Sequence, residues 1–531
     1  MEQRIDQPRA RAWARRGAIM IGTGSLASLV AGAAVAPAAV VPRARAHAHL
    51  GGTLVIAANT APTSLNPALN GNGPPQAWYS ELAYDSLTYQ APNGKLEPDL
   101  ATAWHYSADN RVLDLTLRKG VRFSDGSPLT ASGVKRYIQY FVHAGGPFES
   151  NLASINKITV TGPLSLRLQM AASNPYITFD LSQNIVAGDV IGPRGLSNIK
   201  SLGTTTDGTG PYVLDSSASV AGSKYIYVPN KYYWDPARIH WKRIEIEVIG
   251  DPTAALDALK TGQVDFALGT AQDAAAAKAD GLQVTSAPGN WASLFLFDRS
   301  GAIVPALKSV KVRQALNWAF NRAAIGHALF GRYSVPTDEV VPPGQVGYSV
   351  ADAHMYGYNV AKAKALLAQA GYAHGFTLPM LVYNFNPGES VLAQAIASSL
   401  SAIGVNVQIT QPATLSQLLQ DQPKFPAIAF EFGSEPIYVE GQAILNPNGG
   451  ALNPLKSNNA TIDRLMAAIG TAPPAKIAAA SDALETYVMK QGWFAPIAVQ
   501  PNLVFASKHL GGTGLNGANP VPDVLNLTPR S

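Results

Sequence analysis

Short stretches of the chain alternate hydrophobic and polar residues, which is the pattern of a β-strand buried on one face. Leu113, Leu115 and Leu117 alternate with polar residues, and residues 243–249 repeat this pattern. Gly162-Pro163 separates two further stretches and predicts a hairpin. The other strands that we expect lie at residues 51–57, 158–160, 164–170, 264–267, 379–382 and 405–409.

Between these strands, apolar residues recur at helical spacing behind residues that can cap a helix. Thr130, Asp251, Ser309 and Asn359 are the candidate caps, and Gly262 ends the helix that Asp251 begins. Strands that alternate with capped helices indicate an α/β fold. The helices that we expect lie at residues 78–87, 130–141, 252–261, 309–319, 359–371, 390–403 and 475–490.

The length of 531 residues exceeds one ordinary domain and predicts two or three lobes. The formal charge of +5 is small for this length, and the basic residues are scattered, which argues against nucleic acid as a partner. The chain contains no cysteine. This composition excludes disulfides, thiol catalysis and a lipid-modified cysteine anchor.

The first 48 residues have the pattern of an export signal. Arg15-Arg16 is followed by an uncharged, Ala- and Gly-rich run over residues 17–41, and Ala46-His47-Ala48 provides an A-x-A cleavage site. Twin arginines before a weakly hydrophobic core resemble a Tat signal. The run is also long enough for a membrane anchor, which is the alternative. We expect cleavage, and hence a free, periplasmic protein without a lipid anchor.

Residues 117–134, LRKGVRFSDGSPLTASGV, are similar to a signature of extracytoplasmic solute-binding proteins of the oligopeptide, dipeptide and nickel class, family 5. Members of this family are the capture subunits of ABC importers. The resemblance extends from residue 51 to about residue 525. Further segments resemble the family in the same order, namely 51–57, 84–87, 96–104, 208–212, 230–234 and 312–317.

The resemblance implies a bilobed periplasmic binding protein of α/β class that closes on its ligand by a hinge. An extra domain is inserted in the first lobe of such proteins. The implied organisation is a signal peptide at 1–48, lobe I at 49–92, 203–292 and 495–531, the inserted domain at 93–202, and lobe II at 293–494.

The sequence offers no support for catalysis. It contains neither G-x-S-x-G nor H-E-x-x-H, and its nine histidines are dispersed. We therefore expect a binding protein without cofactor or metal, whose partners are a small peptide or similar ligand and the ABC permease in the membrane. We expect it to act as a monomer.

Candidate ligand-binding residues follow from the resemblance. Glu435 falls where oligopeptide-binding relatives carry an aspartate that pairs with the ligand's α-ammonium. The alternative is that Glu435 is a solvated glutamate without a role in binding. Ala429 lies where those relatives can place an arginine that helps to hold a ligand carboxylate. The remaining candidates are Tyr383, Asn384, Phe432, Gly433, Ser434, Asn290, Trp291, Asn72, Gln76, Tyr79 and Gln500.

Several alternatives stay open from the sequence. Within the same fold, the ligand could be a nickel or metallophore complex, an opine or a small glycoside instead of a peptide. The protein could also serve as a sensor coupled to a chemoreceptor. An exported hydrolase is a third possibility, although no residue set for that chemistry is recognisable.

Overall fold

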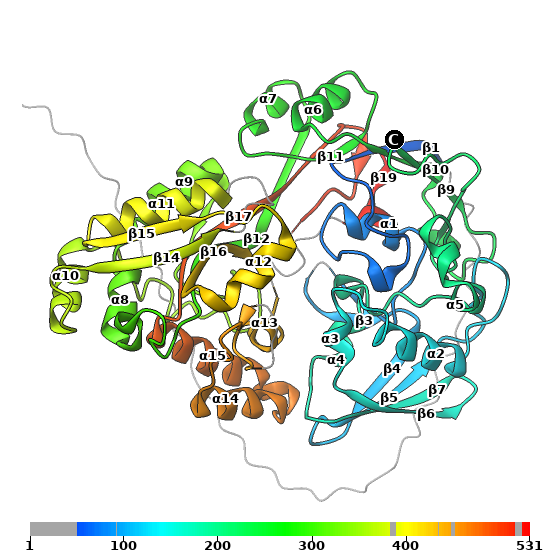
Figure 1. Cartoon of the computed structure of the whole chain (residues 1–531). Coiled ribbons are helices and arrows are strands. Elements are labelled where there is room, and N and C mark those ends of the chain that lie inside the picture. The colour runs from blue at the N-terminus through cyan, green and yellow to red at the C-terminus, as the bar shows by residue number, and fades with distance from the viewer. Residues whose placement is uncertain are drawn as a thin grey trace, which may run out of the picture. The chain divides into compact units, whose positions relative to one another are not determined.

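Two long antiparallel strands, β12 (Gln283–Leu296) and β17 (Phe494–Ala506), form a ribbon through the centre of the largest sheet. The computed structural model describes residues 50–91, 93–382, 389–433, 435–447, 452–515 and 523–530, so the expected signal peptide lies outside the described residues. The sheet order is β15-β14-β16-β12-β17-β11-β1-β10-β9-β8, with β13 beside β17. Figure 1 shows the ribbon running between the two groups of strands.

The strands beside one part of the ribbon belong to the first lobe, whose core includes Leu54, Ile56, Ile244, Ile246 and Phe266. Strands β10 and β11 both pair in parallel with β1, and α6 (Pro252–Lys260) connects them, which confirms the predicted β-α-β unit. The bounds are β1 Gly51–Ala58, β8 Tyr212–Leu214, β9 Lys224–Pro229, β10 Trp241–Val248 and β11 Phe266–Leu268.

The strands beside the other part of the ribbon belong to the second lobe, which has a separate apolar core. Its strands are β13 Val335–Pro336, β14 Phe376–Val382, β15 Val405–Thr410 and β16 Ala427–Phe432. Its helices are α8 Val310–Trp318, α9 Arg322–Phe330, α10 Val360–Gln369, α11 Glu389–Ser401, α12 Leu415–Asp421, α13 Ile437–Ile444, α14 Ala460–Gly470 and α15 Pro474–Gln491.

The signature segment, residues 117–134, connects the end of β5, in a separate antiparallel sheet of order β4-β5-β7-β6, to the start of α2. Leu113, Leu115 and Leu117 are buried there, which confirms the predicted strand, and the predicted hairpin forms from β6 and β7. Figure 1 shows this sheet beside α2. The bounds are β4 Ala101–Tyr106, β5 Val112–Leu117, β6 Ile155–Gly162, β7 Ser165–Met170, α2 Ala131–Phe141, α3 Glu149–Leu152, α4 Ile177–Asp180 and α5 Pro193–Ser197.

Thr130 caps α2, as predicted, because its hydroxyl accepts a hydrogen bond from the Gly133 amide at 3.0 Å. Replacing Thr130 with alanine is expected to lower the free energy of unfolding by about 1 kcal/mol, since the amide loses its acceptor. Urea denaturation of purified protein measures this change. Thr130→Ser keeps the acceptor and is the matched control, and equal stability of the alanine and serine variants would contradict the capping role.

Two helix predictions were wrong in part. The helix expected at 78–87 is α1, Gln76–Glu81, because the carbonyls of Leu82 and Ala83 accept hydrogen bonds from Tyr212 and Gly210 instead of continuing the helix. A Cβ on Gly210 would lie 2.6 Å from the Tyr84 nitrogen, so this close approach requires glycine. Ser309 precedes α8, but its side chain makes no capping hydrogen bond.

The two lobes also contact each other outside the ribbon. Asn110, on the loop between β4 and β5, donates hydrogen bonds to the carbonyls of Gly470 and Ala472 at 2.9 and 3.0 Å. The Tyr438 hydroxyl donates to the Ser173 carbonyl at 2.9 Å. Among the described residues, no helix is long and apolar enough to cross a bilayer.

Candidate ligand-binding cleft

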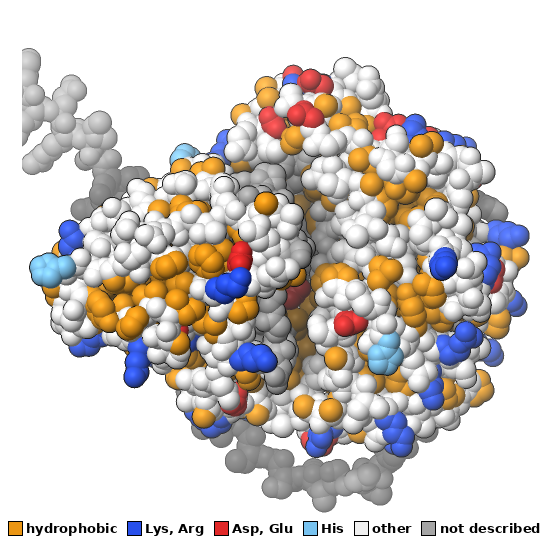
Figure 2. Space-filling view, viewed as in Figure 1, with side chains coloured by type: hydrophobic (Ala, Val, Ile, Leu, Met, Phe, Trp, Pro, Cys, Tyr) orange, Lys and Arg blue, Asp and Glu red, His pale blue; other side chains and the backbone are white. Residues whose placement is uncertain are grey.

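A cleft of about 780 Å³ lies between the lobes and takes wall residues from both. Figure 2 shows the surface hollowed between them. Ligand pockets in proteins commonly measure about 300 to 1,000 Å³, so the cleft suits a small organic molecule or a short peptide.

The ribbon itself supplies part of the wall where its pairing is interrupted. Pro288 pairs with Pro501, and the next pair joins Trp291 to Val499, which leaves Asn290 and Gln500 within the interruption. Proline has no amide hydrogen for the ladder, and an irregular ladder redirects the side chains beside it. Both amide side chains line the cleft.

Most polar residues of the wall are neutral amides. Asn72 donates a hydrogen bond to the carbonyl of Asn184 at 2.8 Å, and the Asn184 amide in turn donates to Gln90. These contacts fix one side of the cleft. The amides of the wall are Asn59, Asn72, Gln90, Asn184, Gln272, Asn290, Gln500 and Asn502, and the larger apolar residues are Ile249, Leu268, Phe148, Phe179, Leu329, Phe330, Phe432 and Leu503.

Two carboxylates complete the wall. Glu431, near the end of β16, is 5% exposed, and its Oε1 has no hydrogen-bond partner among the described residues. Glu435 is half-buried and follows the strand. Burial raises the pKa of each side chain to about 7, because a charged carboxylate loses hydration there.

Further acidic groups lie near Glu435. Glu440 is fully buried; its Oε1 accepts from the Glu435 amide and its Oε2 from the Trp291 indole, each at 3.1 Å. Burial, and secondly the charge of Glu435, raise the pKa of Glu440 well above its usual range. Asp180 accepts from Asn151 at 3.0 Å, and burial, together with the charge of Glu435, raises the pKa of Asp180 to about 7.

The wall contains no Lys, Arg or His side chain among the residues that line the cleft. The short segments outside the described ranges between residues 92 and 522 are likewise free of charged residues in the sequence. The cleft therefore presents a negative or neutral surface to a ligand. In the described part of the chain, no group of three or more His, Asp and Glu side chains is arranged to hold a metal ion.

The structure brings many of the sequence-predicted residues to one cleft. Its wall contains Asn72, Asn290, Phe432, Gly433, Glu435 and Gln500. Tyr383, Asn384 and Ser434 lie outside the described residues.

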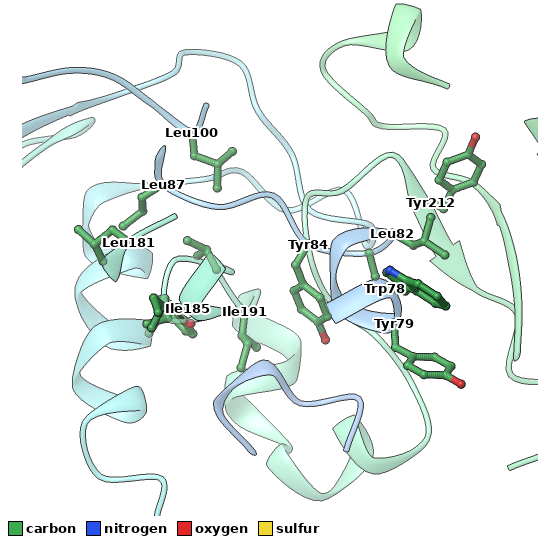
Figure 3. Close-up of a cluster of buried hydrophobic side chains, with 14 of the residues drawn as sticks. Trp78, Tyr79, Leu82, Tyr84, Leu87, Leu100, Leu181, Ile185, Ile191 and Tyr212 are labelled. Atoms are coloured by element: carbon green, nitrogen blue, oxygen red, sulfur yellow. Dashed lines mark hydrogen bonds between the residues drawn. The ribbon is translucent and has the colours of Figure 1, made fainter. Parts of the chain in front are cut away.

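Three candidates lie elsewhere. Trp291 is fully buried behind the wall, in contact with Phe295 and Phe432. Tyr79 belongs to the core of the first lobe, as Figure 3 shows, and donates a hydrogen bond to the Thr60 carbonyl. Gln76 donates to Thr60 and to the Ala61 carbonyl.

Glu431 is the functional candidate that sequence reasoning missed. It lies within the apolar strand residues 427–432, AIAFEF, and a single glutamate in such a run is a signal because unpaired carboxylates are rarely buried. The neutral amides of the first lobe carry no comparable signal, since Asn and Gln are common in exposed loops.

Comparison with known proteins agrees with this geometry. The family model described as bacterial extracellular solute-binding proteins, family 5, middle, matches residues 95–451. The glutathione-binding protein GsiB of Salmonella paratyphi A is 26% identical over 488 residues, which cover 86% of this chain and 91% of that protein.

Solved structures share the fold. The binding protein AgaA from A. tumefaciens R10 in complex with agropinic acid has a TM-score of 0.75 at 22% identity, covering 90% of this chain and 99% of that one. DppA from Helicobacter pylori in complex with the peptide STSA has a TM-score of 0.74 at 20% identity, covering 91% and 99%. The bilobed α/β fold and the family resemblance are thus confirmed, and the chain belongs to the bacterial extracellular solute-binding proteins of family 5.

Proposed function

We propose that this solute-binding component of an ABC importer captures short peptides in the cleft between its lobes. The observation that carries the proposal is the amide-rich wall of a cleft of about 780 Å³. Asn and Gln side chains both donate and accept hydrogen bonds, so they complement a peptide backbone without selecting its side chains. Relatives whose names state a peptide or glutathione ligand support this class of ligand.

Glu435 holds the amino terminus of the peptide in this proposal. A cationic group that is removed from water must be paired, because leaving it unpaired costs several kcal/mol. Glu435 supplies a half-buried carboxylate in the wall, and no basic side chain of the wall competes for it.

The protein releases its peptide unchanged to the permease subunits and acts as a monomer in the periplasm. The twin-arginine segment and the absence of cysteine support export without a lipid anchor. Relatives that are named as binding proteins support capture without turnover.

Replacing Glu435 with glutamine should weaken the binding of a tripeptide with a free amino terminus by about 10-fold or more, because the ammonium loses its charged partner. Calorimetry with a tripeptide and its N-acetylated form measures the effect, and the acetylated form should bind both proteins equally. Glu97→Gln, an exposed glutamate of β3 (Leu96–Pro98), is the matched control.

Two results would count against this assignment. If Glu435→Gln binds the tripeptide with unchanged affinity, Glu435 is a solvated side chain that does not pair with the amino terminus. The absence of any thermal shift with a broad peptide library would overturn peptide capture itself.

A further inference from the structure

Glu431 presents an unsatisfied carboxylate to the cleft. The residue is 5% exposed, and its Oε1 has no hydrogen-bond partner among the described residues. Its neighbour across the β12–β16 pairing is Ala292, which offers no side-chain donor. A buried acceptor without a donor destabilises the protein unless something else supplies one. The cleft, which Glu431 lines, is the direction from which a ligand donor can come.

The charged residues of the cleft indicate which kind of ligand donor fits Glu431. Glu431 and Glu435 are the charged residues of the wall, and the other polar side chains are neutral. Glu435 by itself can pair with the one ammonium group of a peptide amino terminus. A second carboxylate, buried and unpaired, is matched by a second positive group on the ligand.

We propose that Glu431 forms a second cation subsite, and that the cleft selects peptides that carry a lysine- or arginine-type side chain and no free carboxylate. This inference rests on the proposed function, because it requires that Glu435 binds the amino terminus of the peptide. A free ligand carboxylate would enter a wall that has two like charges and no basic side chain to pair with it. Amidated or esterified peptides avoid that penalty and keep the amino terminus.

The acid–base chemistry of the site supports the same assignment. Burial raises the pKa of Glu431 to about 7, so Glu431 loses its charge as the pH falls below this value. No neighbouring charge among the described residues contributes to this shift. Burial also raises the pKa of Glu435, the other carboxylate of the wall, to about 7, and the acidic side chains of Asp180 and Glu440 interact with Glu435. Affinity for a cationic side chain should therefore rise with pH through about 7.

The test uses mature protein and trialanine amide, with three analogues that place lysine at the first, second or third position. In calorimetry at pH 8, at least one lysine analogue should bind about 10-fold tighter than trialanine amide. The same analogue with a free carboxyl terminus should bind more weakly than its amide. Glutathione, which has two carboxylates and one ammonium, should bind weakest.

Glu431→Gln should remove the preference for lysine, so that this variant binds the lysine analogue and trialanine amide with equal affinity. Glu435→Gln should weaken the binding of all the free-amine peptides and keep the lysine preference. The preference should also decrease between pH 8 and pH 5.5 in the parent protein but stay small at every pH in Glu431→Gln. A melting temperature of Glu431→Gln at pH 8 that equals or exceeds the parent's shows that the variant is folded.

The outcomes separate the two proposals. Equal binding of trialanine amide and all lysine analogues, or a lysine preference that survives Glu431→Gln, would overturn the cation subsite and leave peptide capture intact. Binding of 1,5-diaminopentane without binding of any peptide would support the subsite and overturn peptide capture. Tight binding of glutathione would overturn the selection against free carboxylates, and no binding of any probe would overturn both.

Discussion

Replacing Arg322 with methionine is expected to lower the free energy of unfolding by about 3 to 5 kcal/mol. Arg322 is the first residue of α9 and is 8% exposed. Its guanidinium donates to the carbonyls of Thr337, Pro496, Asn317 and Tyr356 and to the Asn317 side chain, at 2.8 to 3.1 Å. Methionine fills much of the same volume but leaves these buried acceptors without donors.

The same substitution should also affect ligand binding in the cleft. Arg322 joins α9 to β17, and Leu329 and Phe330 of α9 line the cleft. Urea denaturation measures the stability, and calorimetry measures ligand affinity in the folded fraction. Arg332→Met is the matched control, since Arg332 is exposed, and it should change the free energy of unfolding by less than about 0.5 kcal/mol. A loss below about 1 kcal/mol for Arg322→Met would contradict the anchoring role.

Replacing Trp291 with alanine is expected to lower the free energy of unfolding by about 3 to 5 kcal/mol. The indole is fully buried, stacks on Phe295 at 4.9 Å between ring centres, and meets Phe432 and Phe494 nearly perpendicularly. The substitution leaves a cavity and removes the donor to Glu440. Because Phe432 lines the cleft, ligand affinity should fall although Trp291 does not belong to the wall.

Trp291→Phe separates the contribution of aromatic packing from that of the hydrogen bond to Glu440. Phenylalanine keeps most of the aromatic packing but not the indole N–H, so the loss should be about 1 to 2 kcal/mol. Chemical denaturation of the two variants at one pH provides the comparison. An equal loss in both would mean that the hydrogen bond to Glu440, and not the packing, carries the effect.

Local patterns predicted much of the fold because their causes are local. The alternation around Leu115 and the caps at Thr130 and Asn359 depend on residues within one turn or one strand. The end of α1 at Glu81 depends instead on Gly210, which is distant in the sequence. A helical pattern cannot reveal that a remote amide will bind the next carbonyl.

The candidate site, too, was predicted in part and missed in part. The family resemblance located Asn290 and Gln500, which the ribbon brings to one wall. It could not decide whether Trp291 faces the cleft or the core, since an isolated tryptophan suits both. Glu431 was missed because the resemblance directed attention to the loop after the strand, while the unusual residue lay inside the strand.

The interrupted ribbon between Pro288 and Ser293 has a mechanical consequence. A paired ribbon resists bending wherever each bend must break ladder hydrogen bonds, and prolines at 288, 496 and 501 contribute no amide donors in this region. Bending at this level therefore sacrifices few bonds. Since Asn290 and Gln500 lie in the same interruption and line the cleft, any change in the angle between the lobes is coupled directly to contacts with the ligand.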